Sequence, residues 1–481
     1  MLGSWPSPSY YSSMLKSGAM TGQKLLRRGW VAAMLLLSLG ASAQQSVPVM
    51  VIDRVTIIDG TGTPTLEDGA IVVEGGRIRA IGRRDTIPRV PGATVIDATG
   101  KFVIPGLIDA HVHFDQSAGL FTRPDLVDLR SVRTYADEVE RTRERLPQTL
   151  LRYLWSGVTA VVDMGGPMWT FDVRDSTRAS LDAPRIVVAG PLISTEPDPE
   201  LESADPPVIA VETAADARAT VQRIAERGSD LIKILFLYHP FDDFDYYAEL
   251  VEVVIAESHR LRLRAAVHAT ELATARAAVD AGADILVHSV EDQPVDDDFI
   301  TTLKARDVLY IPTLLVTEGY DEVFGQRVNL SEIEQRVGDP DVIQSWGELA
   351  KIPPGSIPGG VPPATMLSFR PTEFFNLQRI YAAGVRIAAG SDAGNIGTLH
   401  GPALHREMEL MVEAGMRPLD VVVAATRNAA AVMGKSEETG TLEEGKTADL
   451  VLLDADPTLD IRNTRKIFRV MKAGEWIADI P

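Results

Sequence analysis

Two histidines stand two residues apart at the end of an apolar run, IPGLIDAHVHF, residues 104–114. In a β-strand, residues i and i+2 project from the same face, so His111 and His113 would present both imidazoles to one side. Two imidazoles on one face can bind one metal ion. An isolated pair of this kind is more often a strand end whose histidines meet solvent, so the rest of the chain has to decide.

Four further polar residues lie within or directly after apolar, strand-like runs. They are Lys233, His268, His288 and Asp392. Burying a charged lysine in a strand is costly unless the charge is paired. A neutral lysine amine, in contrast, can take up CO2 and become a carbamate, an anionic oxygen ligand able to bridge two cations. The alternative for Lys233 is a side chain that reaches out to the rim of the domain.

Together, these side chains would supply four imidazoles, one carbamate and one carboxylate. A single catalytic zinc keeps three protein ligands and an open position, so the set is larger than one ion needs. Two metal ions about 3.5–4 Å apart would use it well, with a bridging hydroxide as the nucleophile. The sequence contains no cysteine, which leaves only nitrogen and oxygen ligands. Zinc suits such ligands, and manganese, cobalt and iron stay open.

The elements that would position these residues follow the pattern of a parallel α/β domain. Helical segments such as residues 272–282 alternate with eight β-like runs, at residues 107–114, 158–165, 185–190, 231–236, 264–270, 284–290, 309–316 and 386–394. Eight β/α units indicate a TIM-like (β/α)8 barrel, in which all C-terminal strand ends converge on one face. An open doubly wound sheet is the alternative, but no glycine-rich phosphate loop favours it.

Short β-rich, glycine-punctuated segments flank this region on both sides. They predict a small β-sandwich subdomain formed by residues 44–106 and 437–481, with the barrel over residues 107–436. Residues 317–378 show no clear strand and are rich in Pro and Gly. Long loops are often functional lids, and this one follows the seventh strand on the face where barrel active sites form. A lid insertion is therefore expected here.

Residues 1–43 have the three parts of a secretory signal: basic residues, an apolar run, and small residues before a predicted cleavage site after Ala43. The apolar run is too short to span a bilayer comfortably. We therefore expect an exported, periplasmic or secreted protein with no stable membrane anchor once the signal is cleaved, an uncleaved anchor being the alternative. The formal net charge of −20 argues against nucleic acid as a partner.

The other histidines allow an internal comparison. His259 lies in a polar helical stretch and is expected on the surface, and His400 and His405 are expected near an exposed helix start. Tyr238 and His239 follow the fourth strand in LYHP and are candidate substrate contacts. Tyr238 would donate a hydrogen bond to the oxyanion or to a substrate carboxylate, its alternative being an aromatic ring packed at the barrel rim.

The combination of HxH, a strand-four lysine, two later histidines and GSDAG resembles the amidohydrolase superfamily. It is similar to the binuclear members near the imidazolonepropionase-like and Xaa-Pro dipeptidase-like group. The resemblance runs from about Pro48 to Trp476 and includes ATRNAAAVMGKSEETGTLEEGKTADLVLLDADP. It departs from the dipeptidase pattern after the fifth and sixth strands, where the chain reads HAT and VHS. No ligand is lost there, but the substrate assignment is affected.

The resemblance implies that His111, His113 and Asp392 hold the more buried metal ion. It implies the second ion on His268 and His288, with carboxylated Lys233 as the bridge. Asp392 would also accept a proton from the attacking water and deliver it to the leaving group. A homo-oligomer is implied by analogy alone.

The expected activity is hydrolysis of an amide bond in a dipeptide or an N-acyl amino acid. Hydrolysis of a lactone or ester by the same centre is the alternative. Deamination of a cyclic amidine is disfavoured by Lys233, because such relatives usually use one metal and lack the bridging lysine. A barrel that only binds ligand is disfavoured because all six ligand positions are filled.

Overall fold

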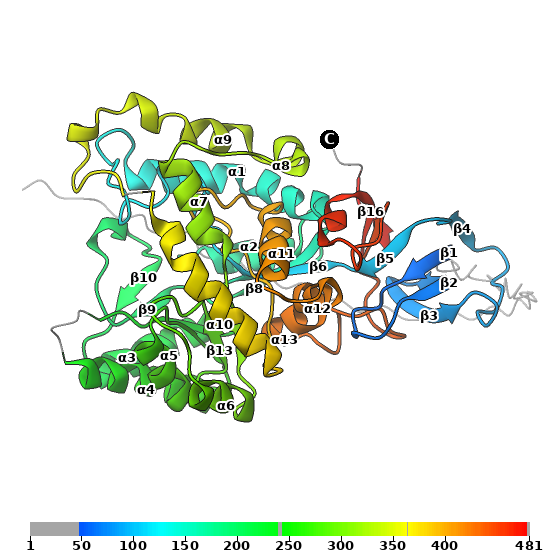
Figure 1. The fold of residues 1–481 in the computed structure, drawn as a ribbon, viewed down its shortest axis with the longest axis horizontal. Coiled ribbons are helices and arrows are strands. Elements are labelled where there is room, and N and C mark those ends of the chain that lie inside the picture. The colour runs from blue at the N-terminus through cyan, green and yellow to red at the C-terminus, as the bar shows by residue number, and fades with distance from the viewer. Residues whose placement is uncertain (1–47, 239–242, 363, 479–481) are drawn as a thin grey trace, which may run out of the picture. The chain divides into compact units, whose positions relative to one another are not determined.

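The computed structural model describes residues 48–238, 243–362 and 364–478 (Figure 1). The predicted signal segment and His239 lie outside the described residues. Within the described ranges, no helix combines the length and the apolarity needed to cross a membrane.

Strands from both ends of the described chain form one mixed sheet, as expected for the predicted β-subdomain. Its order is β17-β16-β15-β5-β1-β2-β3, with β4 pairing with β1. The strands are β1 (Val49–Ile57), β2 (Leu66–Glu74), β3 (Arg77–Arg83), β4 (Thr94–Asp97), β5 (Phe102–Pro105), β15 (Leu450–Leu453), β16 (Ile467–Lys472) and β17 (Glu475–Trp476). The two ends meet where β5 pairs antiparallel with β15, so that residue 104 lies opposite residue 451.

Parallel strands make up the second region, a TIM-like α/β barrel. One sheet has the order β6-β7-β8 and the other β10-β9-β11-β12-β13-β14. These strands are β6 (Leu107–Val112), β7 (Val158–Asp163), β8 (Arg185–Val188), β9 (Leu192–Ser194), β10 (Val208–Ala210), β11 (Ile232–Leu235), β12 (Ala265–His268), β13 (Ile285–Val287) and β14 (Leu309–Ile311).

The eighth run, residues 386–393, connects the two parallel sheets through its backbone. On one side it forms a parallel bridge from Ile387 to Tyr310 of β14, and on the other a bridge from Ala393 to Val112 of β6. The eight β-runs expected from the sequence are therefore all present, although the eighth makes only isolated bridges.

Helices alternate with these strands (Figure 1). They are α1 (Tyr135–Trp155), α2 (Thr170–Thr177), α3 (Ala214–Glu226), α4 (Phe244–Arg260), α5 (Leu272–Asp280), α6 (Asp297–Ala305), α7 (Leu315–Phe324), α8 (Glu332–Val337), α9 (Pro340–Trp346), α10 (Arg370–Ala382), α11 (Ala403–Glu413), α12 (Pro418–Val423) and α13 (Ala429–Met433). Thr134 caps α1 and Thr213 caps α3, each accepting a hydrogen bond from a first-turn N–H.

The hydrophobic core lies in two layers because strand residues alternate between the faces of the sheet. Residues facing the helices include Ile232 and Ile234 of β11. Residues facing the barrel interior include Ala266 and Leu309. Lys233 lies between the two isoleucines and is in register with Ala266, so its side chain is directed to the interior.

The region expected to be a lid is mostly helical. Residues 315–369, called here the insertion segment, cover most of the predicted lid region, residues 317–378, whose last residues lie in α10. The insertion segment contains α7, α8 and α9. The segment has its own apolar cluster, in which Phe324 and Trp346 pack with Leu120 and Phe121 from the loop after β6. The insertion segment is therefore anchored on the loop that follows the first barrel strand.

Candidate metal centre

His111 lies at the carboxyl end of β6, His113 is the first residue after the strand, and both rings point to the same side. Their Nε2 atoms lie 3.1 Å apart. The residue between them, Val112, belongs to the helix-facing core, so both imidazoles face the barrel interior. A register irregularity against β7 between Asp109 and Val112 accompanies this arrangement. The prediction that the two rings share one face is confirmed.

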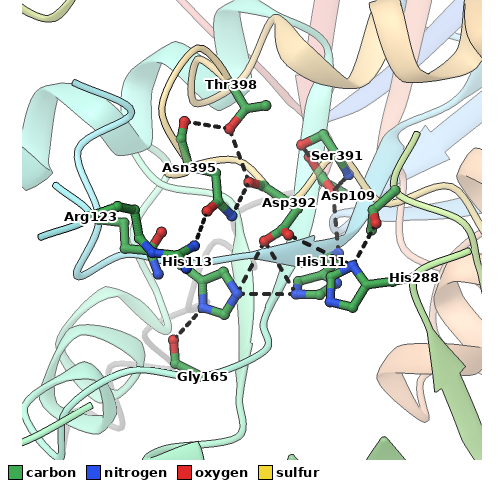
Figure 2. A network of polar contacts seen from close by, with 12 residues as sticks. Asp109, His111, His113, Arg123, Gly165, His288, Ser391, Asp392, Asn395 and Thr398 are labelled. Carbon is green, nitrogen blue, oxygen red and sulfur yellow. Dashed lines mark hydrogen bonds and ion pairs between the residues drawn. The ribbon is translucent and has the colours of Figure 1, made fainter. Parts of the chain in front are cut away.

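Asp392 completes a group of three potential metal ligands. Its Oδ1 lies 3.4 Å from Nε2 of His111 and 3.1 Å from Nε2 of His113 (Figure 2). One ligand atom from each of the three residues lies within 4.8 Å of the others, and all three side chains are buried. Two imidazole nitrogens and a carboxylate oxygen form a donor set that suits a divalent ion such as zinc.

Hydrogen bonds outside this group orient its members. Nδ1 of His113 donates to the Gly165 carbonyl oxygen at 2.7 Å, which fixes the ring so that its Nε2 faces Asp392 (Figure 2). Asp109 accepts from the Ser391 backbone N–H at 2.9 Å and from its hydroxyl. This contact ties the strand that carries the histidines to the loop that carries Asp392.

His268 and His288 lie at the ends of β12 and β13, beside the first group. The centroids of their rings are 4.4 Å apart, and the His288 ring lies 5.0 Å from that of His111. Nδ1 of His288 is hydrogen-bonded to the Thr313 hydroxyl at 2.7 Å. Burial lowers the pKa of His268 to about 3 and that of His288 well below its usual value. Both rings are thus neutral at physiological pH, the form that binds metals.

Lys233 is the most unusual member of the site. Its side chain is 1% exposed, and its Nζ has no hydrogen-bond partner among the described residues. Burial lowers its pKa to about 7, an effect that the charge of Asp392 partly opposes. A substantial fraction of the amine is therefore uncharged near neutral pH. An orphaned, nucleophilic amine facing neutral imidazoles fits a carbamate ligand better than it fits a structural role.

The site opens into a cavity of about 310 Å³. His113, Lys233, His268, His288 and Asp392 are among the residues that line it. Its wall also includes residues of the insertion segment: Val316, Thr317, Tyr320, Met366 and Phe369. The segment thus contributes to the cavity, and its action as a lid stays a prediction.

The structure does not place either substrate-contact candidate in the described lining of the cavity. Tyr238 does not belong to the described lining of the cavity; its ring packs edge-on against Phe244, with centroids 5.0 Å apart. Burial and a hydrogen bond with Glu271 raise the pKa of Tyr238. Its contact with substrate stays a prediction, as does that of His239, which lies outside the described residues.

Two expectations for the remaining histidines were wrong. His400 and His405 are buried, not exposed at a helix start. His400 lies between the Tyr153 hydroxyl and the Gln116 carbonyl oxygen, at 2.7 and 2.8 Å. Other segments, distant in sequence, cover both rings, which the polar sequence around them did not indicate. His259 has a half-exposed side chain paired with Asp284, so the surface prediction for it is confirmed.

Sequence reasoning missed several residues that surround Asp392. Arg123 lines the cavity and contacts Asn395, and Thr398 hydrogen-bonds to the backbone of Asp392. Arg123 lies in a loop without periodicity, so the sequence carried no signal for its position. Asp109 did have a sequence signal, because it is a carboxylate in the apolar run that leads to the two histidines. The structure shows that it is buried.

Comparison with known proteins agrees with this architecture. Residues 102–477 match the amidohydrolase family. The ochratoxinase of Aspergillus niger is 25% identical over 441 residues, covering 87% of this chain and 82% of that protein. The imidazolonepropionase of Geobacillus sp. strain WCH70 is 25% identical over 418 residues, covering 81% and 84%.

Solved structures share the fold. The crystal structure of a Xaa-Pro dipeptidase with bound methionine aligns with a TM-score of 0.69 and 24% identity, covering 89% of this chain and 99% of that one. Members of the matching family hydrolyse carbon–nitrogen bonds with the help of metal ions, and the chain described here has a buried His-His-Asp group in which a metal ion fits. The match extends over most of the barrel and into the β-subdomain, and the chain belongs to the amidohydrolase family.

Proposed function

We propose that this protein hydrolyses an amide bond in a dipeptide or an N-acyl amino acid, using a centre of two divalent ions, zinc being the first choice. The single observation that carries the proposal is Lys233: a buried amine without a hydrogen-bond partner among the described residues, in the same cavity lining as His268 and His288, whose pKa values burial lowers. The dipeptidase among the similar structures supports a peptide-like substrate.

The residues divide into two ligand groups. His111, His113 and Asp392 would hold one ion, and His268 and His288 the other. Lys233 would bridge them after its amine adds CO2 and releases one proton, which yields a carbamate with two oxygen donors. When bound, the ions supply Lewis-acid chemistry that polarises the amide carbonyl and lowers the pKa of the attacking water.

Asp392 has the position needed for proton transfer. As water oxygen bonds to the carbonyl carbon, one Asp392 oxygen takes the water proton. The carboxyl group then returns this proton to the nitrogen as the carbon–nitrogen bond breaks, so that an acid and an amine leave. Burial by itself would raise the pKa of Asp392. The hydrogen bond from His113 and the neighbouring positive charges together have the larger effect and hold the pKa below its usual value, so the carboxylate starts ionised.

We further propose that residues 1–43 direct export and are removed, so that the mature protein acts on a small substrate outside the cytoplasm. The basic, apolar and small-residue regions of this segment support the proposal. Fractionation of cells that express the full chain, with N-terminal sequencing of the product, would test it. A product that keeps residues 1–43 in the cytoplasm would refute it.

The test of the activity uses the chain from Gln44, prepared with zinc and bicarbonate. Amino-acid release would be measured from dipeptides and N-acyl amino acids, beside a parallel set of lactones and esters. Chelator-sensitive amide hydrolysis is the expected result. Turnover of lactones or esters alone would overturn the amide assignment, and equal activity after removal of all metal would overturn the metal-dependent mechanism.

The carbamate needs its own measurement. With ¹³C-labelled bicarbonate, the metal-loaded protein should show a carbamate carbon resonance that is absent from Lys233→Ala. Lys233→Ala should also lose most bound metal and activity, because it removes the bridging ligand. A variant that keeps both would refute the bridge. Lys472→Ala is a matched control, since Lys472 is a buried lysine far along the chain, in β16.

A further inference from the structure

Asp392 has a strained backbone that contacts on both sides hold in place. Its φ of +55° lies in the left-handed region, which a non-glycine residue adopts only when its surroundings impose it. Its N–H donates to the His111 carbonyl oxygen at 2.8 Å. Its own carbonyl oxygen accepts from Asn395 Nδ2 at 3.3 Å and from Thr398 Oγ1 at 3.1 Å. The direction of the carboxylate therefore depends on these contacts.

The side-chain amide of Asn395 has only one suitable orientation. Asn395 is 2% exposed, and its Oδ1 accepts a hydrogen bond from Arg123 Nη1 (Figure 2). The same oxygen accepts a second hydrogen bond from the Tyr320 hydroxyl. Two donors at this atom require it to be the oxygen. The NH2 group must then face the Asp392 carbonyl oxygen, as observed. A rotated amide would bring two oxygens together there and leave the donors of Arg123 and Tyr320 without an acceptor.

Arg123 is itself held firmly by the protein. Its Nε lies 2.9 Å from Oδ1 of Asp125, and its Nη2 lies 2.5 Å from Oδ2 of the same carboxylate. Its Nη1 contacts Asn395 and, at 3.1 Å, the hydroxyl of Tyr320. All three guanidinium nitrogens thus bond to the protein, although Arg123 lies in the wall of the cavity. A guanidinium fixed by these partners can hold the side chain of Asn395 in one orientation.

We propose that Arg123 and Asn395 are positioning residues for Asp392. Arg123 sets the orientation of the Asn395 amide, and Asn395 sets the peptide unit of Asp392, so that its carboxylate keeps the direction needed for proton transfer. The inference rests on the proposed function, because that function assigns the proton transfer to Asp392. Tyr320 comes from α7, so the same contacts connect the insertion segment to the reaction centre.

The competing role for Arg123 is direct binding of substrate, and kinetics separate the two. The variants are Arg123→Gln, Asn395→Ala and the double variant. Positioning predicts that kcat falls about 10- to 100-fold in each single variant while KM stays within about twofold. Because both residues act through one contact, the double variant should be no worse than the poorer single variant. A raised KM with unchanged kcat, or losses that multiply in the double variant, would overturn the proposal.

Arg130→Gln is the matched control. Arg130 lies in the same loop and pairs with Asp128, also two residues away, with Nη2 2.8 Å from Oδ2, but it does not line the cavity. Its removal should leave kcat unchanged. Circular dichroism and metal content would establish that all variants are folded and loaded to the same extent.

A spectroscopic readout keeps the test independent of the substrate. In cobalt-substituted protein, the visible absorption bands depend on the direction of each ligand. Arg123→Gln and Asn395→Ala should shift these bands at equal cobalt content, and Arg130→Gln should not. Unshifted bands in both variants would overturn the positioning role. If the parent protein hydrolyses no amide at all, the proposed function fails, and the cobalt spectra still decide whether Arg123 and Asn395 position Asp392.

Discussion

Replacing Lys233 with methionine should stabilise the metal-free protein, which is the opposite of the usual effect of a buried substitution. The Lys233 side chain is 1% exposed, and its Nζ finds no hydrogen-bond partner among the described residues. Methionine has a similar length and volume and carries no group that needs a partner. The buried amine therefore lowers the free energy of unfolding of the metal-free protein, and only a bound ligand would offset this loss.

The size of this cost follows from the pKa. Burial lowers the pKa of Lys233 from 10.5 to about 7. At pH 7 the unfolded side chain is charged and the folded one is about half charged, so the shift costs the folded state about 4 kcal/mol. Refitting a methionine in the core costs about 1 kcal/mol. We expect a net increase of roughly 3 kcal/mol in the free energy of unfolding.

The pH dependence has a defined sign. Because the folded pKa lies below the unfolded one, the folded state binds fewer protons between about pH 7 and pH 10.5. The free energy of unfolding of the parent protein therefore rises with pH in this window, by up to about 1.4 kcal/mol per unit relative to Lys233→Met. The advantage of the variant should shrink steadily and vanish near the pKa of the unfolded lysine.

The assay is urea unfolding of chelator-treated protein in CO2-free buffer at pH 7, 8.5 and 10. Zinc and bicarbonate are then added back, which should stabilise the parent protein and have little effect on Lys233→Met. Lys472→Met is the control, because the Lys472 amine donates to the Ser180 carbonyl oxygen and its loss should destabilise the protein. A Lys233→Met variant that is less stable at pH 7, or whose stability difference from the parent does not change with pH, would refute the reasoning.

Three further predictions concern single contacts. Asp392→Asn should lower kcat by about 10²–10⁴-fold, because it removes the proton acceptor. Steady-state kinetics combined with metal analysis would check this. Near-normal turnover would contradict the assignment of proton transfer to Asp392. Thr313→Val removes the hydroxyl bonded to His288 Nδ1 and should weaken metal binding about 10-fold in a chelator competition. Thr302→Val, at a partly exposed threonine in α6, is the control and should leave metal binding unchanged. Burial lowers the pKa of His405 to about 3, so below about pH 6.5 the folded state binds fewer protons than the unfolded state. The free energy of unfolding therefore decreases as the pH falls, by about 2 kcal/mol at pH 5. His405→Leu should lose this contribution, measured as the difference in urea unfolding between pH 8 and pH 5; the same acid sensitivity in the variant would show that His405 does not titrate as expected.

Much of the metal centre was predictable because each member is marked locally. Strand alternation places His111 and His113 on one face, and an apolar run marks the end of each strand that carries a candidate ligand. Parallel strands in a barrel bring these ends together whatever their separation in sequence. The pattern of short β-segments also indicated that the two ends of the chain share a sheet, which the pairing of β5 with β15 confirms.

The sequence alone determined the types of the candidate ligands, the alternation of strands and helices, and the absence of cysteine chemistry, because these depend on residue identity and short-range periodicity. The tertiary structure decided the rest. Arg123 meets Asn395 across 272 positions, and His405 is buried because Ser156 and Thr464 close over it. Such contacts follow from how loops and helices pack around the barrel, and packing leaves no periodic trace in a single sequence. The backbone of Asp392 is likewise strained because neighbours from separate segments hold it in place.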